Sequence, residues 1–368
     1  MIRMPNLTSL PPHTGRDYGV TGSSGIMDSF AKAALEKFYG PETISIILSK
    51  YRRSVVTKEA LTADFMRCTD IDFFPINYED PCISGALKLV RKDFGLEEKT
   101  YPVHYCDTFE YDYPESTSAE EPYRTNSKFD SFPSRKKKDC KDHCYETSRV
   151  QLHTLKEGGG LKEFDILANA RAHLVEATEE DKIRMVFGYP FRNLTFECMF
   201  YWPYYTEFLK TPHKMMWGRE IYNGGMSLIH RTASERPGTY FCIDWTKFDK
   251  RVQHSLIRQA FEIIRENFDF TTYYPSEAYT YEGVASLEKR LNRVWEAVIE
   301  TFCHAPVRLP GKERFKRNFA SLPSGSMFTQ LVDSIVNSIV INAICIRVFG
   351  VPPLWYFVLG DDSVFAVL

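Results

Sequence analysis

The stretch that decides how this chain is interpreted is its last fifteen residues, Leu354-Trp355-Tyr356-Phe357-Val358-Leu359-Gly360-Asp361-Asp362-Ser363-Val364-Phe365-Ala366-Val367-Leu368. Two apolar runs rich in β-branched and aromatic residues flank Gly360-Asp361-Asp362, which predicts a β-hairpin with the paired aspartates at its turn. Adjacent carboxylates repel each other, so the pair predicts a compensating cation. Oxygen ligands without Cys or His suit a hard ion, Mg²⁺ or Mn²⁺. Taken alone, the tripeptide is more typical of a solvent-facing hairpin, and the rest of the chain has to favour the metal site.

Composition indicates a soluble globular protein and excludes several classes. The chain has 368 residues, 14% of them aromatic, and a formal net charge of −2, so any nucleic-acid partner must meet a local basic surface. The nine cysteines are mostly scattered singly, which argues against a disulfide framework and favours a reducing compartment. Residues 1–5 show no signal-peptide pattern, and the apolar run Val336–Phe349 is too short and too polar to span a bilayer. We therefore expect no membrane partner.

A long helix is predicted just before the hairpin. Pro323-Ser324-Gly325 introduces it, and it runs from about Thr329 to Val348. Thr329, Asp333 and Asn337 recur at four-residue steps and share one face, and a polar stripe on an apolar helix needs partners. The Ser-Gly turn is either ordinary helix capping or a loop whose hydroxyls contact a template or sugar.

Two further aspartates follow a predicted strand. Tyr240–Ile243 is short and apolar, and it ends at Asp244-Trp245-Thr246-Lys247-Phe248-Asp249, after which an amphipathic helix continues to about Asn267. Asp249 then lies near a helix N-terminus, where an anion is favoured and where it could also serve only as a helix-start residue.

Two basic stretches are candidates for phosphate contact. In the predicted strand that begins near Lys182, alternation places Lys182 and Arg184 on one face, where two cations can bind a triphosphate and its leaving pyrophosphate. Residues 308–317 form the densest basic segment near the candidate site, and we expect them to contact a nucleic-acid backbone. The basic run 135–138 is interpreted as a solvated surface or a phosphate contact. Residues 140–144 contain Cys and His, but we do not interpret them as a metal site.

The order of these segments resembles the core of a viral RNA-dependent RNA polymerase. A basic strand, Asp-x4-Asp, Ser-Gly-x3-Thr on a helix and Gly-Asp-Asp in a hairpin follow each other as in that family, most closely as in partitiviruses and related double-stranded RNA viruses. The resemblance is clear over residues 170–368. It implies an α+β right-hand fold with fingers and an antiparallel palm sheet flanked by helices, and a thumb missing from a C-terminally truncated chain. The expected division is 1–236 arm and fingers, 237–269 palm, 270–320 fingers insertion and 321–368 palm.

The resemblance also implies roles for single residues. Asp244 and Asp361 would hold two Mg²⁺ ions, with Asp362 in support, and Lys182 and Arg184 would hold the incoming triphosphate. Asp249 would accept a hydrogen bond from the ribose 2′-hydroxyl. The template and nucleotide would be positioned by Ser324, Gly325 and Thr329, and the sugar-reading network would be supported by Asn337.

One residue departs from the wider family. Asp333 stands where many positive-strand virus polymerases have Asn, and a carboxylate cannot donate to Asp249 unless it is protonated or bridged. This Asp resembles the partitivirus variant.

The expected activity is template-directed RNA synthesis with RNA template, RNA product and NTPs as partners. A viral capsid protein is a further expected partner, and the expected location is the host cytoplasm, inside the virion. The alternatives are a polymerase remnant that binds RNA without catalysis, and a reverse transcriptase. The second is disfavoured because those enzymes place an aromatic residue at the position of Asp249.

Overall fold

The computed structural model describes residues 5–20, 28–69, 71–219, 221–276, 280–281 and 284–368. It is a mixed α+β protein with a three-stranded, a five-stranded and a two-stranded sheet, as the sequence predicted. The hairpin, the strand before Asp244 and the long helix before the hairpin are all present. Residues 191–208 form one 18-residue helix, α6 (Phe191–Phe208), whose aromatic residues are buried on several sides.

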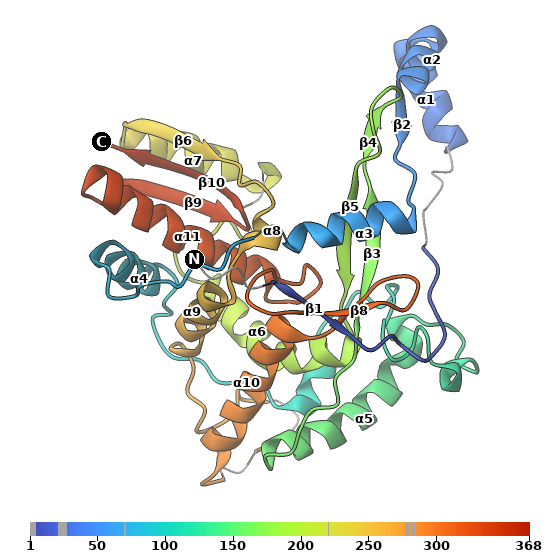
Figure 1. The fold of residues 1–368 in the computed structure, drawn as a ribbon. Coiled ribbons are helices and arrows are strands. Elements are labelled where there is room, and N and C mark those ends of the chain that lie inside the picture. The colour runs from blue at the N-terminus through green and yellow to red at the C-terminus, as the bar shows by residue number, and fades with distance from the viewer. Residues whose placement is uncertain (1–4, 21–27, 70, 220, 277–279, 282–283) are drawn as a thin grey trace.

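The three-stranded antiparallel sheet has the order β6-β10-β9, with β6 (Thr239–Ile243) beside β10 (Asp362–Val367) and β10 beside β9 (Trp355–Leu359). Gly360 closes the β9–β10 hairpin at φ +65°, a conformation that costs other residues more. Helix α11 (Thr329–Phe349) lies along one face of this sheet and α7 (Gly225–Glu235) along the other (Figure 1). The aspartates therefore stand at one end of a sheet that is covered on both faces.

Helix α11 is the central core element. It packs on α4 (Pro81–Asp93), α9 (His254–Arg265) and β9. By length and composition it could cross a membrane, but 67% of its apolar window is buried inside the protein. We therefore interpret it as the core helix of a globular protein.

The five-stranded sheet has the order β1-β8-β7-β3-β5 and carries the basic strand. Its members are β1 (Leu7–Leu10), β8 (Arg314–Arg317), β7 (Val307–Arg308), β3 (Ile166–Ala172) and β5 (Ile183–Gly188). The β3–β5 pair is a long antiparallel ribbon, and beyond it β2 (Tyr51–Arg53) pairs with β4 (Leu174–Glu176). Helices α1 (Ser29–Tyr39) and α2 (Pro41–Lys50) stand at the far end of this projection (Figure 1).

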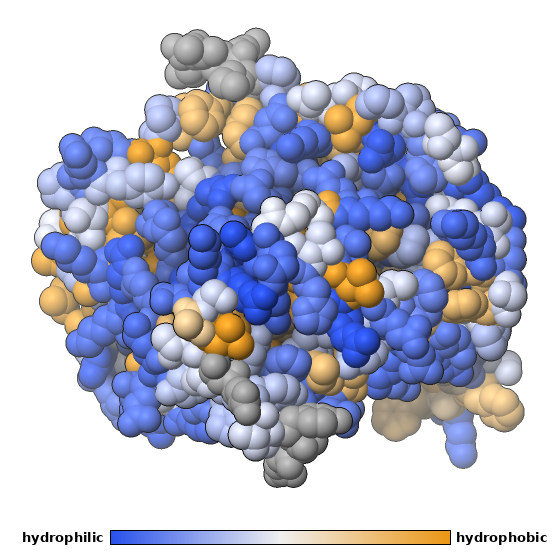
Figure 2. Space-filling model, turned by 90° about the horizontal axis from the view of Figure 1, so that it is seen from below, coloured by the Kyte–Doolittle hydropathy of each residue, from blue (hydrophilic) through white to orange (hydrophobic). Residues whose placement is uncertain are grey.

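The remaining elements join these two sheets or cover them. They are α3 (Lys58–Met66), η1 (Arg67–Thr69), η2 (Tyr105–Glu110), η3 (Ser127–Phe129), α5 (Lys137–Lys156), η4 (Ile221–Asn223), α8 (Phe248–Arg251) and α10 (Leu287–His304). Seen from below, the face in Figure 2 is mostly hydrophilic, with small scattered apolar groups. The proposed division at residues 236, 269 and 320 stays a prediction.

Candidate active site

The Gly-Asp-Asp turn is held from beneath by helix α11. Asn337, which is fully buried, donates through Nδ2 to the carbonyl oxygens of Gly360 (3.1 Å) and Asp361 (3.0 Å). Ser334 Oγ accepts from the Gly360 amide at 2.8 Å. The backbone of the turn is therefore fixed while the side chains of Asp361 and Asp362 stay exposed.

Asp244 comes to the same end of the sheet. Strand β6 pairs with β10 so that Ile243 is opposite Ser363, and one further step along this register places Asp244 opposite Asp362. Such neighbours have Cα atoms about 4.5–5.5 Å apart. Both side chains line one hollow of about 440 Å³. The aspartates, 117 positions apart from 244 to 361, thus meet across one pair of strands, as the sequence interpretation requires.

The electrostatics of the turn agree with this convergence. The pKa of Asp361 is raised by partial desolvation, then by the negative charges of Asp362 and Asp244, while Arg184 opposes the rise. Repulsion of this kind favours a bound cation.

The donor set fits a hard divalent ion, because all three side chains are carboxylates; Asp244 and Asp362 line the hollow, and Asp361 stands exposed on the turn beside it. Among the residues that the structure describes, no three Asp, Glu, His or Cys side chains are already gathered in a ligating arrangement. Mutual repulsion of the carboxylates is the physical reason to expect them to close in only around an ion.

Asn337 also links the two aspartate-bearing segments. Its Oδ1 accepts from Trp245 Nε1 at 2.9 Å, next to Asp244, while its Nδ2 holds the turn. Because both ends of the amide are used inside the protein, Asn337 acts on bound nucleotide only through these segments. It is a positioning residue for these segments, and its expected support of a sugar-reading network stays a prediction.

Asp249 and Asp333 form a second acidic group beside the first. The pKa of Asp249 is raised by burial and by the charges of Asp64 and Asp361, and that of Asp333 is raised well above its ordinary value by burial and by Asp361 and Asp249. Oδ1 of Asp333 is buried and has no hydrogen-bond partner. A raised pKa favours the protonated form, which can donate as an amide does. The departure from Asn at this position therefore leaves hydrogen-bond donation possible.

The basic strand presents its cations as predicted. Lys182 and Arg184 are exposed, while Ile183 and Met185 point into the protein. The charge of Arg184 reaches Asp361, so β5 faces the aspartates.

One further cation, Arg171 of β3, was missed, together with His173 just after that strand, whose pKa is lowered by burial and by the charges of Arg184, Lys182 and Arg171. Arg171 lies directly opposite Arg184, and the amide of His173 donates to the carbonyl oxygen of Lys182. Like charges opposite each other destabilise a strand pair, so this ribbon favours a bound anion. Strand pairing cannot be read from local sequence, which is why Arg171 and His173 carried no signal.

The loop before α11 is fastened to β5. Ser324 Oγ accepts from the Phe187 amide at 3.1 Å, and a Cβ on Gly325 would lie 2.3 Å from the Phe187 carbonyl oxygen. Thr329 Oγ1 donates to the Pro323 carbonyl at 2.5 Å, which closes the loop. The Ser324 side chain is exposed, Gly325 and Thr329 are half-buried, and all three lie between the basic strand and the long helix.

Two buried carboxylates that were not predicted support this arrangement. Asp64 on α3 accepts from Lys250 Nζ at 2.6 Å and from the Met185 amide at 2.8 Å. It therefore links the basic strand β5, which contains Met185, to Lys250, the residue next to Asp249. Glu197 on α6 accepts from Ser326 and Met327. Glu197 did leave a signal, since it is a lone acidic residue in the apolar and aromatic run 194–202.

The expected nucleic-acid contact by residues 308–317 is wrong for the three arginines of this segment. Arg308 and Arg317 are fully buried, Arg308 paired with Glu121 at 2.7 Å, and Arg314 pairs with Asp165 at 2.7 Å. Acids distant in sequence neutralise Arg308 and Arg314, whereas Arg317 donates to the carbonyl oxygens of Ser321 and Phe302.

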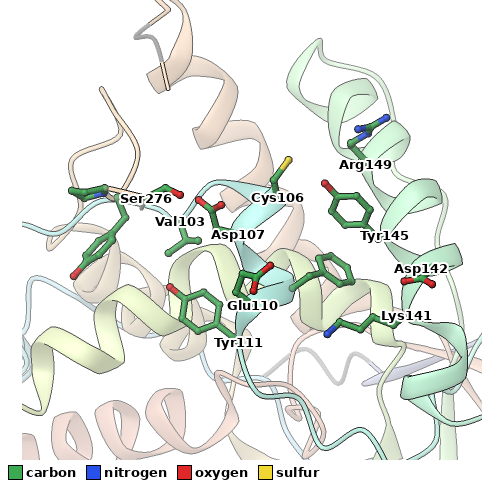
Figure 3. A pocket seen from close by; sticks show the side chains of 13 residues that line it. Val103, Cys106, Asp107, Glu110, Tyr111, Lys141, Asp142, Tyr145, Arg149 and Ser276 are labelled. Carbon is green, nitrogen blue, oxygen red and sulfur yellow. The ribbon is translucent and has the colours of Figure 1, made fainter. Parts of the chain in front are cut away.

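A separate hollow of about 920 Å³ lies between η2 and α5 (Figure 3). Tyr145 and Arg149 of α5 face Cys106 and Asp107 of η2 across it. None of the predicted site residues lines it, so it is not part of the candidate active site.

Comparison with known proteins bears out the resemblance. A family model described as viral RNA-dependent RNA polymerase matches residues 86–368. The chain is 25% identical to the RNA-directed RNA polymerase of White clover cryptic virus 1 (isolate Boccardo/2004) over 97% of its own length and 67% of the relative's.

Two further relatives carry the same description. The RNA-directed RNA polymerase of Atkinsonella hypoxylon virus (isolate 2H) is 24% identical over 74% of this chain and 50% of the relative. That of Cryptosporidium parvum virus 1 (strain KSU-1) is 26% identical over 68% of this chain and 43% of the relative. The chain thus spans from less than half to about two thirds of its relatives. With the family model covering most of its length, the chain belongs to the viral RNA-dependent RNA polymerase family.

Proposed function

We propose that this chain forms the palm and fingers of an RNA-directed RNA polymerase that joins NTPs to an RNA 3′-hydroxyl. The observation that carries the proposal is the register of β6 on β10, which brings Asp244 beside the Asp361–Asp362 turn. A remnant without catalytic function would have no need of a buried amide, Asn337, that fixes both aspartate-bearing segments.

The carboxylates of Asp244, Asp361 and Asp362 would hold Mg²⁺ or Mn²⁺. Such ions lower the pKa of the attacking hydroxyl and stabilise the oxygens of the phosphoryl transfer. The protein's own part is to bring the three carboxylates together on a turn whose backbone α11 holds in place.

The cationic ribbon would bind the incoming triphosphate. Arg184 of β5 acts on Asp361, Lys182 is exposed just before that strand, and Arg171 of β3 lies opposite Arg184. Fixed positive charges offset the negative charge that grows on the leaving pyrophosphate.

Asp249 and Asp333 would read the ribose. Both are close enough to Asp361 for its charge to raise their pKa values, and Asp333 has an unpartnered oxygen. A 2′-hydroxyl can donate to one carboxyl group and accept from the other if that one is protonated. Ser324, Gly325 and Thr329 would shape the wall against which template and nucleotide lie.

The partners are an RNA template, its RNA product and NTPs. Contact with a viral capsid protein, and location in the host cytoplasm within the virion, belong to the same proposal and rest on the resemblance to polymerases of double-stranded RNA viruses.

The test is Asp361→Asn in the full-length protein, with Asp112→Asn as a matched control at an exposed aspartate outside the site. Incorporation of labelled NTPs on a primed RNA template should fall by at least about 10³-fold in the first variant only. Binding of Mn²⁺, followed by electron paramagnetic resonance, should weaken with it. Undiminished synthesis by Asp361→Asn would refute the metal site. RNA binding without any synthesis by the wild type would favour the remnant, and use of dNTPs in place of NTPs would favour a reverse transcriptase.

A further inference from the structure

Glu197 is a carboxyl group in an unusual place. It lies on α6 at 1% exposure, between Phe196 and Cys198, which are also buried. A carboxylate is costly to bury unless it is hydrogen-bonded. No Lys, Arg or His of the described residues forms an ion pair with it.

Both of its oxygens are used, and both point to the same loop. Oε1 accepts from Ser326 Oγ at 2.8 Å, and Oε2 accepts from the Met327 amide at 2.8 Å. Ser326 Oγ in turn accepts from the Phe328 amide at 3.1 Å. Directly or through Ser326, the carboxylate therefore satisfies two of the free amide groups that precede α11.

This position is also electrostatically favourable. Helix α11 is 21 residues long, and its N-terminus carries a partial positive charge that a carboxylate stabilises. Helix capping by a side chain from another element fixes the start of the helix against that element.

The anchored loop connects three parts of the candidate active site. Ser324 and Gly325 lie against Phe187 at the end of the basic strand, and the same strand leads through Tyr189 into α6 and Glu197. At its other end the loop begins α11, which holds the Gly-Asp-Asp turn through Asn337. Movement of the loop would thus displace both the wall of the nucleotide site and the helix beneath the turn.

We infer that Glu197 is the positioning residue that anchors the loop 323–328 and the start of α11, so that nucleotide and template meet the carboxylates in a fixed geometry. The inference rests on the proposed polymerase function. It extends that function to a residue outside the four sequence motifs.

Protonation of Glu197 should loosen the anchor. If Oε1 of Glu197 is protonated, it becomes a hydrogen-bond donor. It then faces the Ser326 hydroxyl, which donates its own hydrogen to Oε1 when the carboxylate is ionised, so this hydrogen bond is weakened. Burial raises the pKa of Glu197 to about 7, and hydrogen bonding from Ser326, Met327 and Tyr189 opposes the rise. The other titratable groups that sense its charge are Tyr189, Cys198 and Tyr201, all with pKa values raised chiefly by burial, and Arg317 acts on Tyr189.

The test compares Glu197→Gln with Glu207→Gln, a control at the far end of the same helix, where Glu207 bonds Lys210 and not the loop. Hydrogen exchange of the amides of Met327 and Phe328 should accelerate at least about tenfold in Glu197→Gln and remain unchanged in the control. kcat/KM for the NTP should fall about 10- to 100-fold, the loss typical of a displacement near 1 Å. The activity of the wild type should rise with pH near pH 7 as Glu197 ionises, and this rise should be absent in Glu197→Gln.

Ser326→Ala is the second variant, should Glu197→Gln fail to fold. It removes one of the two bonds and leaves the carboxylate, so it should show a smaller increase in exchange and a smaller loss of kcat/KM.

Unchanged exchange at Met327 and Phe328 would overturn the anchor. Faster exchange with unchanged kcat/KM and an unchanged pH profile would overturn the positioning role while leaving the polymerase function intact. If the wild type itself fails to synthesise RNA, the proposed function fails, and the exchange measurement still decides whether Glu197 anchors the loop.

Discussion

The buried pair of Asp64 and Lys250 gives a prediction whose magnitude follows from the structure. The two side chains are 2.6 Å apart and only 4% and 6% exposed, and Asp64 also accepts from the Met185 amide at 2.8 Å. Asp64→Asn keeps the size and an acceptor for Met185, but it removes the carboxylate paired with the buried Lys250 ammonium and leaves Asp249 as the acid whose charge interacts with Lys250.

Removing one partner of a buried ion pair costs about 3–5 kcal/mol, because the remaining charge stays desolvated. We expect the lower end, about 3 kcal/mol, because the Met185 hydrogen bond survives in Asp64→Asn. At the lower end of the usual 2–4 °C per kcal/mol for large domains, the melting temperature should fall by about 6 °C. Urea unfolding followed by far-UV circular dichroism measures the free energy, with Asp112→Asn as the control.

The double variant Asp64→Asn/Lys250→Met sharpens the test. If an unpaired ammonium is the cause, then removing it should restore more than half of the lost stability. The reasoning is refuted if Asp64→Asn lies within about 0.5 kcal/mol of the wild type, or if the two single changes simply add.

Three further changes test the loop, the turn and the titration of the anchor. Gly325→Ala should reduce kcat/KM for the NTP by about 100-fold, because its Cβ would lie 2.3 Å from the Phe187 carbonyl oxygen. The control is Gly160→Ala, whose Cβ would meet no atom within 4 Å and which should leave kcat/KM unchanged. Equal kcat/KM values for the two variants would contradict this reasoning. Asn337→Ala should weaken Mn²⁺ binding by about 10- to 100-fold, since both aspartate-bearing segments lose their shared support, and unchanged binding by paramagnetic resonance would count against it. Glu197 binds a proton more tightly in the folded state (pKa about 7) than in the unfolded state (4.5), so wild-type stability should fall as pH rises from about 4.5 to 7, by roughly 3 kcal/mol. Thermal unfolding of Glu197→Gln between pH 4.5 and 8 should show a slope reduced by this amount, while Asp249, Asp333 and Asp361, whose pKa values are also raised, keep their own contributions. A slope equal to that of the wild type would exclude a contribution from Glu197.

The sequence by itself determined the local elements and the chemistry of the site. Two apolar, β-favouring runs on either side of Gly360 predicted the hairpin, and a two-residue alternation predicted Lys182 and Arg184 on one exposed face. The four-residue step of Thr329, Asp333 and Asn337 predicted a polar face within a buried helix. These inferences succeeded because hydrophobic periodicity is a local property that burial enforces.

Only the tertiary structure decided which of these groups meet. The register of β6 on β10 brings Asp244 to the turn, and the pairing of β3 with β5 places Arg171 against Arg184. The same holds for Asp64 and Lys250, and for Glu197 and the loop before α11. The basic segment at 308–317 shows the opposite case, since its arginines were expected to contact nucleic acid, but Arg308 and Arg314 pair with acids of the fold and Arg317 is buried against carbonyl oxygens. Charge along a sequence does not reveal its partner, because ion pairs and strand registers form between residues brought together only by folding.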